Sequence, residues 1–294
     1  MIKKIKKQFV LFATLVITII IGITLAISYY RIKGYHFHRY IVLSIILIAA
    51  VILGSILLSN FAIRPIQRAW QQQLDFTADA SHELRTPLSV IQSNLEIVME
   101  AEDSTIAEQK KWLTNIANES HRMTELVEAL LVLSRADTGA NPPIIEEFPL
   151  SSLINIKKEA FSPLAKLNEI EIQSDIPDDL ILHADLNKMD QLFTILIDNA
   201  IKYMCHPGSI LVKASYVKKG IRIDVSDNGV GIAAEDLPHI FQRFYRADKS
   251  RSNAIKGTGL GLSIAQMIVS EHNGSIHVES TPDIGTTFTI FFPV

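Results

Sequence analysis

The feature that most constrains the fold is a stripe of apolar residues spaced four, three, four and three positions apart: Leu84, Leu88, Ile91, Leu95 and Val98. This spacing predicts an amphipathic helix, from about Pro65 to Glu100, that packs against other helices. A second helix is predicted after the turn-like residues 102–105, ending near Ala136, from a similar stripe: Leu113, Ile116, Met123, Val127 and Leu130. One hairpin cannot bury both stripes, so we expect a homodimer in which two copies form a four-helix bundle.

His82 lies off the first stripe and is expected to face solvent. It precedes Leu84 by two residues, which places it roughly 200° around the helix from the buried side. A lone exposed histidine is usually a solvated surface residue, but here the carboxylate of Glu83 follows directly and can accept the Nδ1 proton, leaving Nε2 as a nucleophile. Thr86 shares the face of His82, and Pro87 is expected to bend the helix. The pattern predicts a phosphoryl acceptor.

Two long uncharged apolar runs, residues 9–28 and 40–63, precede these helices. Each is long enough to cross a bilayer as a helix, and we favour two transmembrane helices. The alternatives are a buried core helix or, for the first run, a cleaved signal peptide. The positive-inside rule places residues 1–8 and the C-terminal part in the cytoplasm, because cations flank the runs on those sides: Lys3, Lys4, Lys6, Lys7, Arg64 and Arg68.

The connector at residues 29–39 is then extracellular and too short to fold as a sensory domain. We therefore expect the stimulus to be sensed within or near the bilayer, or through a membrane partner protein. His36 and His38 are either membrane-interface residues or a metal or pH sensor. Cys205 is the only cysteine, which excludes an intramolecular disulfide; it is either a redox handle or an incidental thiol.

Residues 139–148 contain Gly139, Pro142 and Pro143 and predict a linker to a separate domain at residues 149–294. In that domain helical and strand patterns interleave, which predicts an α/β sandwich with helices on one face of a mixed sheet. The predicted strands are residues 210–215, 221–226, 275–280 and 286–292, and the predicted helices are residues 186–203 and 260–272.

The motif His82-Glu83-Leu84-Arg85-Thr86-Pro87-Leu88 resembles the H-box of bacterial sensor histidine kinases, and residues 65–138 resemble their dimerisation and histidine phosphotransfer domain. Residues 149–294 resemble their ATP-binding domain, which has the GHKL, or Bergerat, fold. The matching segments occur in the family's order: IDNAIKY at 197–203 (N-box), DNGVGI at 227–232 (G1 box), IFQRFYRAD at 240–248 (F-box), GTGLGLSI at 257–264 (G2 box) and GTTF at 285–288.

In the N-box, the resemblance implies that Asn199 supplies a neutral oxygen to Mg²⁺, while Lys202 and Tyr203 lie near the phosphates and the nucleotide. Many members of the family have another polar residue four positions before that asparagine, where this chain has Ile195. A second polar contact from that turn is therefore not carried over.

In the G1 box, the resemblance implies that Asp227 accepts a hydrogen bond from the adenine amino group. Gly229 and Gly231, beside Ile232, are expected to let the backbone approach the nucleotide without a Cβ in the way. As a bare pattern, Asp-Asn-Gly is also a common turn.

The G2 glycines are expected to expose amide groups to phosphate at the start of a helix. A dinucleotide-binding fold is the usual rival for such glycines, but it leaves the other boxes unexplained. We expect the F-box aromatic residues to pack in the core and residues 247–256 to form a lid over ATP. The remaining predicted nucleotide-binding residues are Arg246, Gly257, Thr258, Gly259, Leu260, Gly261 and Leu262.

The resemblance implies a protein-histidine kinase of the bacterial cell membrane that uses ATP and Mg²⁺. The γ-phosphoryl group passes to Nε2 of His82, with Glu83 as base and Arg85 beside it, and then to an aspartate of a cognate response regulator. Thr86 resembles the family residue that positions water for dephosphorylating the regulator. The rival classes are a GHKL ATPase that acts as a conformational clamp and a non-catalytic membrane scaffold. No nucleic acid partner is expected.

Overall fold

The computed structural model describes residues 64–100, 104–137, 142–204, 207–247 and 257–293, with short helical stretches between residues 18 and 54. The chain forms two compact units, residues 1–78 and 79–294. None of the helices described here is both long and apolar enough to cross a membrane. Most of the predicted transmembrane runs at 9–28 and 40–63, and all of the connector at 29–39 except Tyr29, lie outside the described residues.

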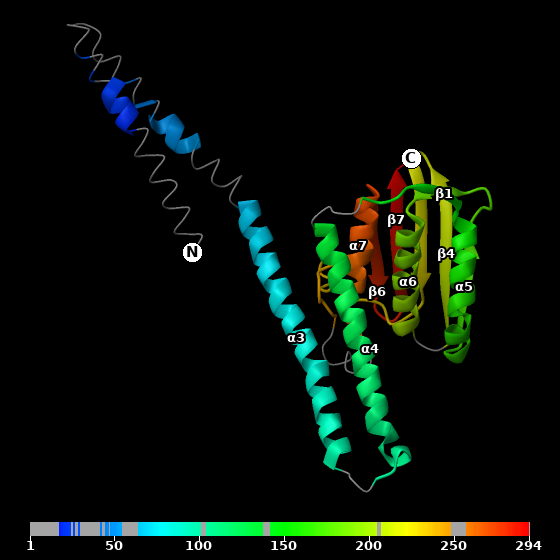
Figure 1. The fold of residues 1–294 in the computed structure, drawn as a ribbon. Coiled ribbons are helices and arrows are strands. Elements are labelled where there is room, and N and C mark those ends of the chain that lie inside the picture. The colour runs from blue at the N-terminus through cyan, green and yellow to red at the C-terminus, as the bar shows by residue number, and fades with distance from the viewer. Residues whose placement is uncertain are drawn as a thin grey trace. The chain divides into compact units, whose positions relative to one another are not determined.

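Helices α3 (Arg64–Glu100) and α4 (Ile106–Asp137) form the predicted hairpin (Figure 1). Helix α4 begins with a capping box in which Thr105 N donates to Glu108 Oε2 at 2.8 Å and Glu108 N donates to Thr105 Oγ1 at 3.4 Å. These bonds satisfy amides that the first turn of a helix leaves without partners. Helix α3 continues through Pro87.

The side of α3 that faces α4 differs from the predicted stripe. Pro87 and Asn94 are buried, whereas Leu88 and Leu95 are each 46% exposed. Asn115 Nδ2 on α4 donates to Asn94 Oδ1 at 3.3 Å, so a pair of polar side chains lies between the two helices. The stripe was predicted to pack against the helices of two copies, and the hairpin by itself leaves these two leucines of the stripe exposed. They form an apolar face that the hairpin leaves uncovered.

The C-terminal domain contains a five-stranded sheet in the order β2-β4-β5-β7-β6, and the sheet is mixed, as predicted. Strand β2 is parallel to β4, and the other neighbours are antiparallel. A separate antiparallel pair is formed by β1 and β3. The bounds are β1 Glu146–Pro149, β2 Ile170–Asp175, β3 Ile181–Ala184, β4 Gly208–Val217, β5 Gly220–Asp227, β6 Ser275–Thr281 and β7 Gly285–Pro293.

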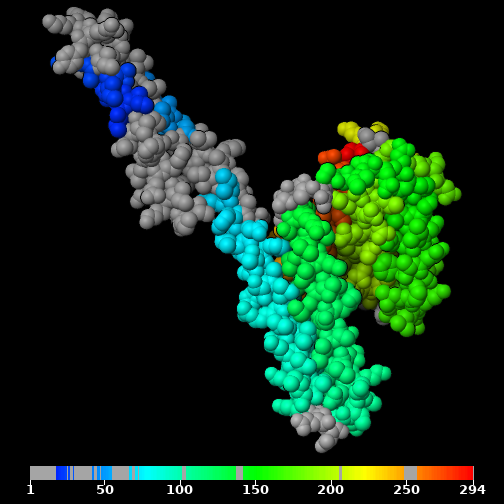
Figure 2. Space-filling model, in the orientation of Figure 1, coloured from blue at the N-terminus to red at the C-terminus, as the bar shows by residue number. Residues whose placement is uncertain are grey.

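Three helices cover one face of this sheet, which confirms the predicted sandwich (Figures 1 and 2). They are α5 (Leu150–Leu167), α6 (Leu186–Lys202) and α7 (Gly261–Glu271). Helix α5 and strands β1, β2 and β3 were not predicted from the sequence. The core between helices and sheet is apolar and fully buried at its centre, with Leu192, Phe193, Ile197, Ile210, Ile223, Ile268 and Ile290.

Helix α6, which carries the N-box, is held by buried charges at two points. Lys157 of α5 is 9% exposed, and its Nζ lies 2.5 Å from Asp190 Oδ1 and 3.0 Å from Thr194 Oγ1. At the start of α6, Asp185 accepts hydrogen bonds from the backbone N–H groups of Lys188 and Ile144. The two contacts fix α6 against α5 and against the chain that enters the domain.

Burial raises the pKa of the Asp185 carboxyl, but the hydrogen bonds from Ile144 and Lys188 and the positive charge of Lys188 outweigh it, so the net pKa lies below its usual value. The backbone N–H of Asp185 also donates to His272 Nε2 at 3.0 Å. Since Nε2 accepts, Nδ1 carries the proton and donates to Ile268 O at 2.8 Å. The start of α6 and the end of α7 are thereby joined.

Candidate active site

The hairpin presents His82 to solvent on α3, as predicted. Its side chain has no hydrogen-bond or ion-pair partner within the described part of the chain. Thr86, one turn later and also exposed, donates from Oγ1 to the backbone oxygen of His82 at 3.4 Å, and Arg85 is exposed beside them. The imidazole is thus open to a reactant from another domain or molecule.

The Glu83 carboxylate faces α4 and lies 3.7 Å from Arg122 Nη2. The prediction that Glu83 holds the Nδ1 proton of His82 therefore has no contact to support it in this conformation. The role of Glu83 as base stays a prediction. Arg122 was not singled out from the sequence, because the pairing depends on how the two helices pack.

The Asp227 carboxylate lies at the end of β5, beside the start of β7. Its Oδ1 accepts from Gly229 N at 2.9 Å and from Thr286 N at 3.3 Å. Burial raises the pKa of this carboxyl, and the two hydrogen bonds lower it only in part, so the net pKa is above its usual value. Oδ2 has no described partner and can accept a hydrogen bond from a ligand, which suits the predicted contact with an adenine amino group.

The glycines of the G1 box have a physical reason within the protein itself, and the expected approach of the backbone to the nucleotide stays a prediction. A Cβ at Gly229 would lie 2.3 Å from Tyr203 O, and a Cβ at Gly231, where φ is +67°, would lie 2.1 Å from Thr281 O. Both positions therefore require glycine because the turn packs against the protein's own backbone. The close packing also holds the G1 turn against the N-box, since Val230 N donates to Tyr203 O at 3.0 Å.

Ser280 and Thr286 support the same turn and were not predicted as site residues. Ser280 Oγ accepts from Ile232 N at 2.8 Å and donates to Gly285 O at 2.8 Å. Thr286 is 6% exposed, and its hydroxyl lies 2.9 Å from Ser280 Oγ. The GTTF segment at residues 285–288 was the available sequence signal for Thr286, whereas Ser280 is placed only by the pairing of β6 with β7.

The N-box residues lie in the last turn of α6 and at its end. Asn199 is half-buried, and its side chain has no hydrogen-bond partner within the described residues. Lys202 Nζ lies 2.5 Å from Asp198 Oδ2, and Tyr203, at the C-cap of α6, is 40% exposed. A half-buried carboxamide without a protein partner fits the predicted neutral ligand for Mg²⁺. No group of three or more histidine, cysteine or acidic side chains that could hold a metal is found in the described parts.

The G2 box extends into the first turn of α7, and the N-terminus of this helix receives no side-chain cap. Its first amides are therefore free to bind phosphate oxygens. Gly259 has φ of +69°, and its carbonyl accepts from Phe244 N at 2.9 Å, which joins the G2 box to the F-box. Leu260 is buried at the N-cap, and Thr258 Oγ1 accepts from its N–H at 3.4 Å.

For the remaining residues of the predicted phosphate site, the structure gives burial and neighbouring side chains. A Cβ at Gly257 would meet no described residue within 4 Å, a Cβ at Gly261 would lie 3.3 Å from the Ile195 side chain, and Leu262 is half-buried. Arg246 is half-buried. In the F-box, the ring of Phe241 packs edge-on against Phe288, with centroids 6.4 Å apart, which confirms its packing role. Residues 248–256 of the predicted lid lie outside the described residues.

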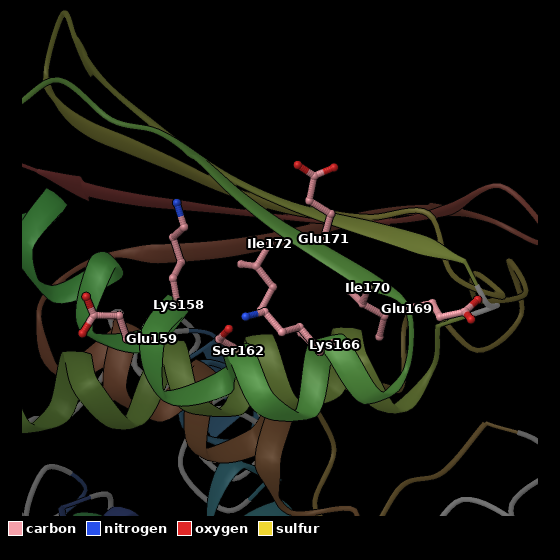
Figure 3. Close-up of a pocket in the computed structure, with 9 residues that line it drawn as sticks. Lys158, Glu159, Ser162, Lys166, Glu169, Ile170, Glu171 and Ile172 are labelled. Carbon is pink, nitrogen blue, oxygen red and sulfur yellow. The ribbon is translucent and has the colours of Figure 1, made fainter.

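One groove on this domain lies away from these motifs. It has a volume of about 620 Å³ and lies between α5 and the edge strand β2 (Figure 3). Lys158, Ser162, Lys166 and Glu171 line it, and Lys158 Nζ already donates to Ser174 Oγ at 3.1 Å. The motifs, the hydrogen bonds between them and the uncapped start of α7 therefore identify the nucleotide site better than cavity size does.

An exposed histidine on a helical hairpin, followed by this α/β nucleotide fold, matches the fold of histidine kinases. Residues 72–139 match the His Kinase A (phospho-acceptor) domain, and residues 184–294 match the histidine kinase-, DNA gyrase B-, and HSP90-like ATPase family. The chain belongs to both domain families and is homologous to sensor histidine kinases.

One similar protein is the sensor histidine kinase RppB of Synechocystis sp., which is 35% identical over 238 residues. The match covers 81% of this chain and 52% of RppB. The chain thus spans about half the length of the curated relatives it matches.

Two solved structures share the fold. The histidine kinase AdeS of Acinetobacter baumannii has a TM-score of 0.59 and 26% identity, covering 72% of this chain and 97% of the AdeS chain. Histidine kinase ThkA, solved in complex with the response regulator protein TrrA, has a TM-score of 0.63 and 25% identity, covering 77% of this chain and 63% of the ThkA chain.

Proposed function

We propose that this protein is a sensor histidine kinase that transfers the γ-phosphoryl group of ATP to Nε2 of His82. The observation that carries the proposal is the presence, in one chain, of an exposed histidine without a side-chain partner and a nucleotide site built around Asp227. A clamp ATPase or a scaffold needs the nucleotide site but has no use for the exposed acceptor. The sensor histidine kinase homologues support the same activity.

In this proposal the protein mainly binds and orients the reactants. Asp227 Oδ2 accepts from the adenine amino group, and the amides of the G2 box and the start of α7 hold phosphate oxygens. Mg²⁺, when bound through Asn199, offsets phosphate charge, and its other ligands would be water and phosphate oxygens. Lys202, Tyr203 and Arg246 complete the nucleotide contacts.

The phosphoryl group then passes from His82 to an aspartate of a cognate response regulator. The ThkA–TrrA complex supports a partner of this kind, because that relative binds a response regulator protein. Thr86 lies exposed one turn from His82, where it suits a role in positioning water for dephosphorylation of the regulator. Loss of the Thr86 hydroxyl should then slow dephosphorylation without preventing labelling of His82.

We further propose that the chain acts as a homodimer, since Leu88 and Leu95 leave an apolar face of the hairpin uncovered.

The proposed domain bounds are 65–138 for the dimerisation and phosphotransfer domain, 139–148 for the linker and 149–294 for the ATP-binding domain. Residues 9–28 and 40–63 are proposed to cross the bacterial cell membrane, with 29–39 outside and both termini in the cytoplasm. Exposed isoleucines in the described helical stretches, such as Ile20 and Ile45, support this placement. The stimulus would then be sensed within or near the bilayer, or through a membrane partner protein.

The test is incubation of the full chain in detergent with γ-labelled ATP and Mg²⁺, comparing wild type with His82→Gln. The matched control is His121→Gln, since His121 is also an exposed histidine of the hairpin, with a side chain 79% exposed. We expect acid-labile, base-stable label on wild type and on the control but none on His82→Gln. ATP hydrolysis without label would point to a clamp ATPase, and neither hydrolysis nor label would point to a scaffold.

A further inference from the structure

The ion pair between Glu83 and Arg122 crosses the hairpin beside the proposed phosphoryl acceptor. Arg122 Nη2 lies 3.7 Å from Glu83 Oε2, and the side chains are 25% and 37% exposed. The pair is therefore shielded in part from water. Because water weakens the attraction in a fully exposed ion pair, partial shielding makes this pair stronger than an exposed one. It joins the residue directly after His82 to the other helix of the hairpin.

The Glu83 carboxylate cannot pair with Arg122 and accept the Nδ1 proton of His82 at the same time. Neighbouring residues on a helix point about 100° apart, so His82 faces solvent while Glu83 faces α4. To accept the Nδ1 proton of His82, the Glu83 carboxylate must turn away from α4. Such a turn breaks its contact with Arg122.

Arg122 has a second carboxylate partner. Its Nη1 lies 3.8 Å from Glu119 Oε2, one turn earlier on α4, and the Glu119 side chain is only 14% exposed. When Glu83 leaves, the guanidinium therefore keeps a counter-ion. The two carboxylates compete for one cation, so the strength with which Arg122 holds Glu83 depends on Glu119.

We propose that Arg122 is a positioning residue that holds Glu83 away from His82, so that phosphorylation of His82 requires the cross-helix pair to open. The proposal rests on the proposed kinase function. In the reaction, His82 Nε2 forms a bond to the γ-phosphorus, the bond from that phosphorus to the β,γ-bridging oxygen breaks, and ADP leaves. The Nδ1 proton passes to the Glu83 carboxylate, which is free to take it only after leaving Arg122.

The test measures the initial rate of His82 labelling by the full chain in detergent, over a range of ATP concentrations. We expect Arg122→Ala to raise the rate at saturating ATP by about two- to fivefold with an unchanged KM for ATP, the size of effect that a partly exposed ion pair supports. Arg122→Lys should fall between that variant and wild type. Glu119→Gln should slow labelling about twofold, because it leaves Arg122 to Glu83 alone.

Two controls separate positioning from a general structural effect. In a Glu83→Gln background, adding Arg122→Ala should leave the residual rate unchanged, because the group through which Arg122 acts is absent. His121→Ala removes a neighbouring side chain of α4 that pairs with Glu125 instead, and it should label like wild type.

The outcomes are distinct. An Arg122→Ala rate equal to or below that of wild type, or an increase that persists in the Glu83→Gln background, overturns the inference while leaving the proposed function intact. If Arg122→Ala unfolds, Arg122→Lys and Glu119→Gln decide, since they must change the rate in opposite directions. Absence of label on wild type refutes the proposed function itself.

Discussion

Gly259 provides a sharp test of how the G2 box is built, through the substitution Gly259→Ala. Its φ of +69° costs an L-residue roughly 1–2 kcal/mol. A Cβ there would also lie 2.8 and 2.9 Å from the backbone C and Cα of Phe244, closer than real contacts allow, and 3.0 Å from its O. Relief of that contact strains the hydrogen bond from Phe244 N to Gly259 O, worth about 1 kcal/mol. We therefore expect the substitution to destabilise the domain by about 2–3 kcal/mol.

The assay is denaturant unfolding of the ATP-free protein, read from the C-terminal domain. Gly257→Ala is the matched control for stability, because a Cβ at Gly257 meets none of the described residues within 4 Å and its φ is not in the left-handed region. We expect that variant to stay within about 0.5 kcal/mol of wild type. If the G2 loop instead changes conformation to relieve the strain, ATP should bind more weakly. Its Kd should rise about tenfold for each 1.4 kcal/mol of strain. Equal stability and equal ATP affinity for Gly259→Ala and wild type would refute the reasoning.

Two further predictions concern the anchors of α6. Asp185→Ala should lower the free energy of unfolding by about 1–2 kcal/mol at neutral pH through loss of the N-cap. Because the native pKa of Asp185 is lowered, its contribution to stability is complete above the carboxyl's unfolded pKa and is lost as the pH falls through the native pKa. Unfolding curves of variant and wild type should therefore converge below about pH 4. Asp190→Ala should lower the free energy of unfolding by about 3 kcal/mol, because it leaves the buried Lys157 ammonium without its counter-ion. Lys157→Met should lower it by under about 1 kcal/mol, because Asp190 is 46% exposed and can be hydrated. Thermal unfolding of both variants checks this order, and a larger loss of stability for Lys157→Met would contradict it.

The sequence predicted the hairpin and the later strands well because their signals are local. A 3.5-residue apolar repeat is enough to place helices over Arg64–Glu100 and Ile106–Asp137. The same reasoning missed α5, which contains Pro163 and has polar residues between its buried positions. It also missed β1 and β3, which are four residues each, and β2, which is six residues long. Short strands carry too few alternations for a period of two to be recognised.

The site shows the same division. Motif spacing predicted Asn199, Asp227 and the G2 glycines as site residues. In the structure, backbone hydrogen bonds join the segments that carry them, such as the bond from Val230 N to Tyr203 O. The sequence did not show that the protein's own backbone also requires the glycines at positions 229 and 231, because a sequence does not reveal which backbone atoms from distant segments lie against a turn. Ser280 was missed for the same reason.

What the sequence determined by itself is the chemistry available in each segment: an imidazole followed by a carboxylate on a helix, and glycines and an aspartate around strand and helix ends. These follow from residue type and from spacing along one element. Only the tertiary structure decided that Glu83 faces Arg122 and that Asp227 presents Oδ2 after committing Oδ1 to two amides. Such contacts join residues that are far apart in the chain, and their geometry depends on how whole helices and strands pack.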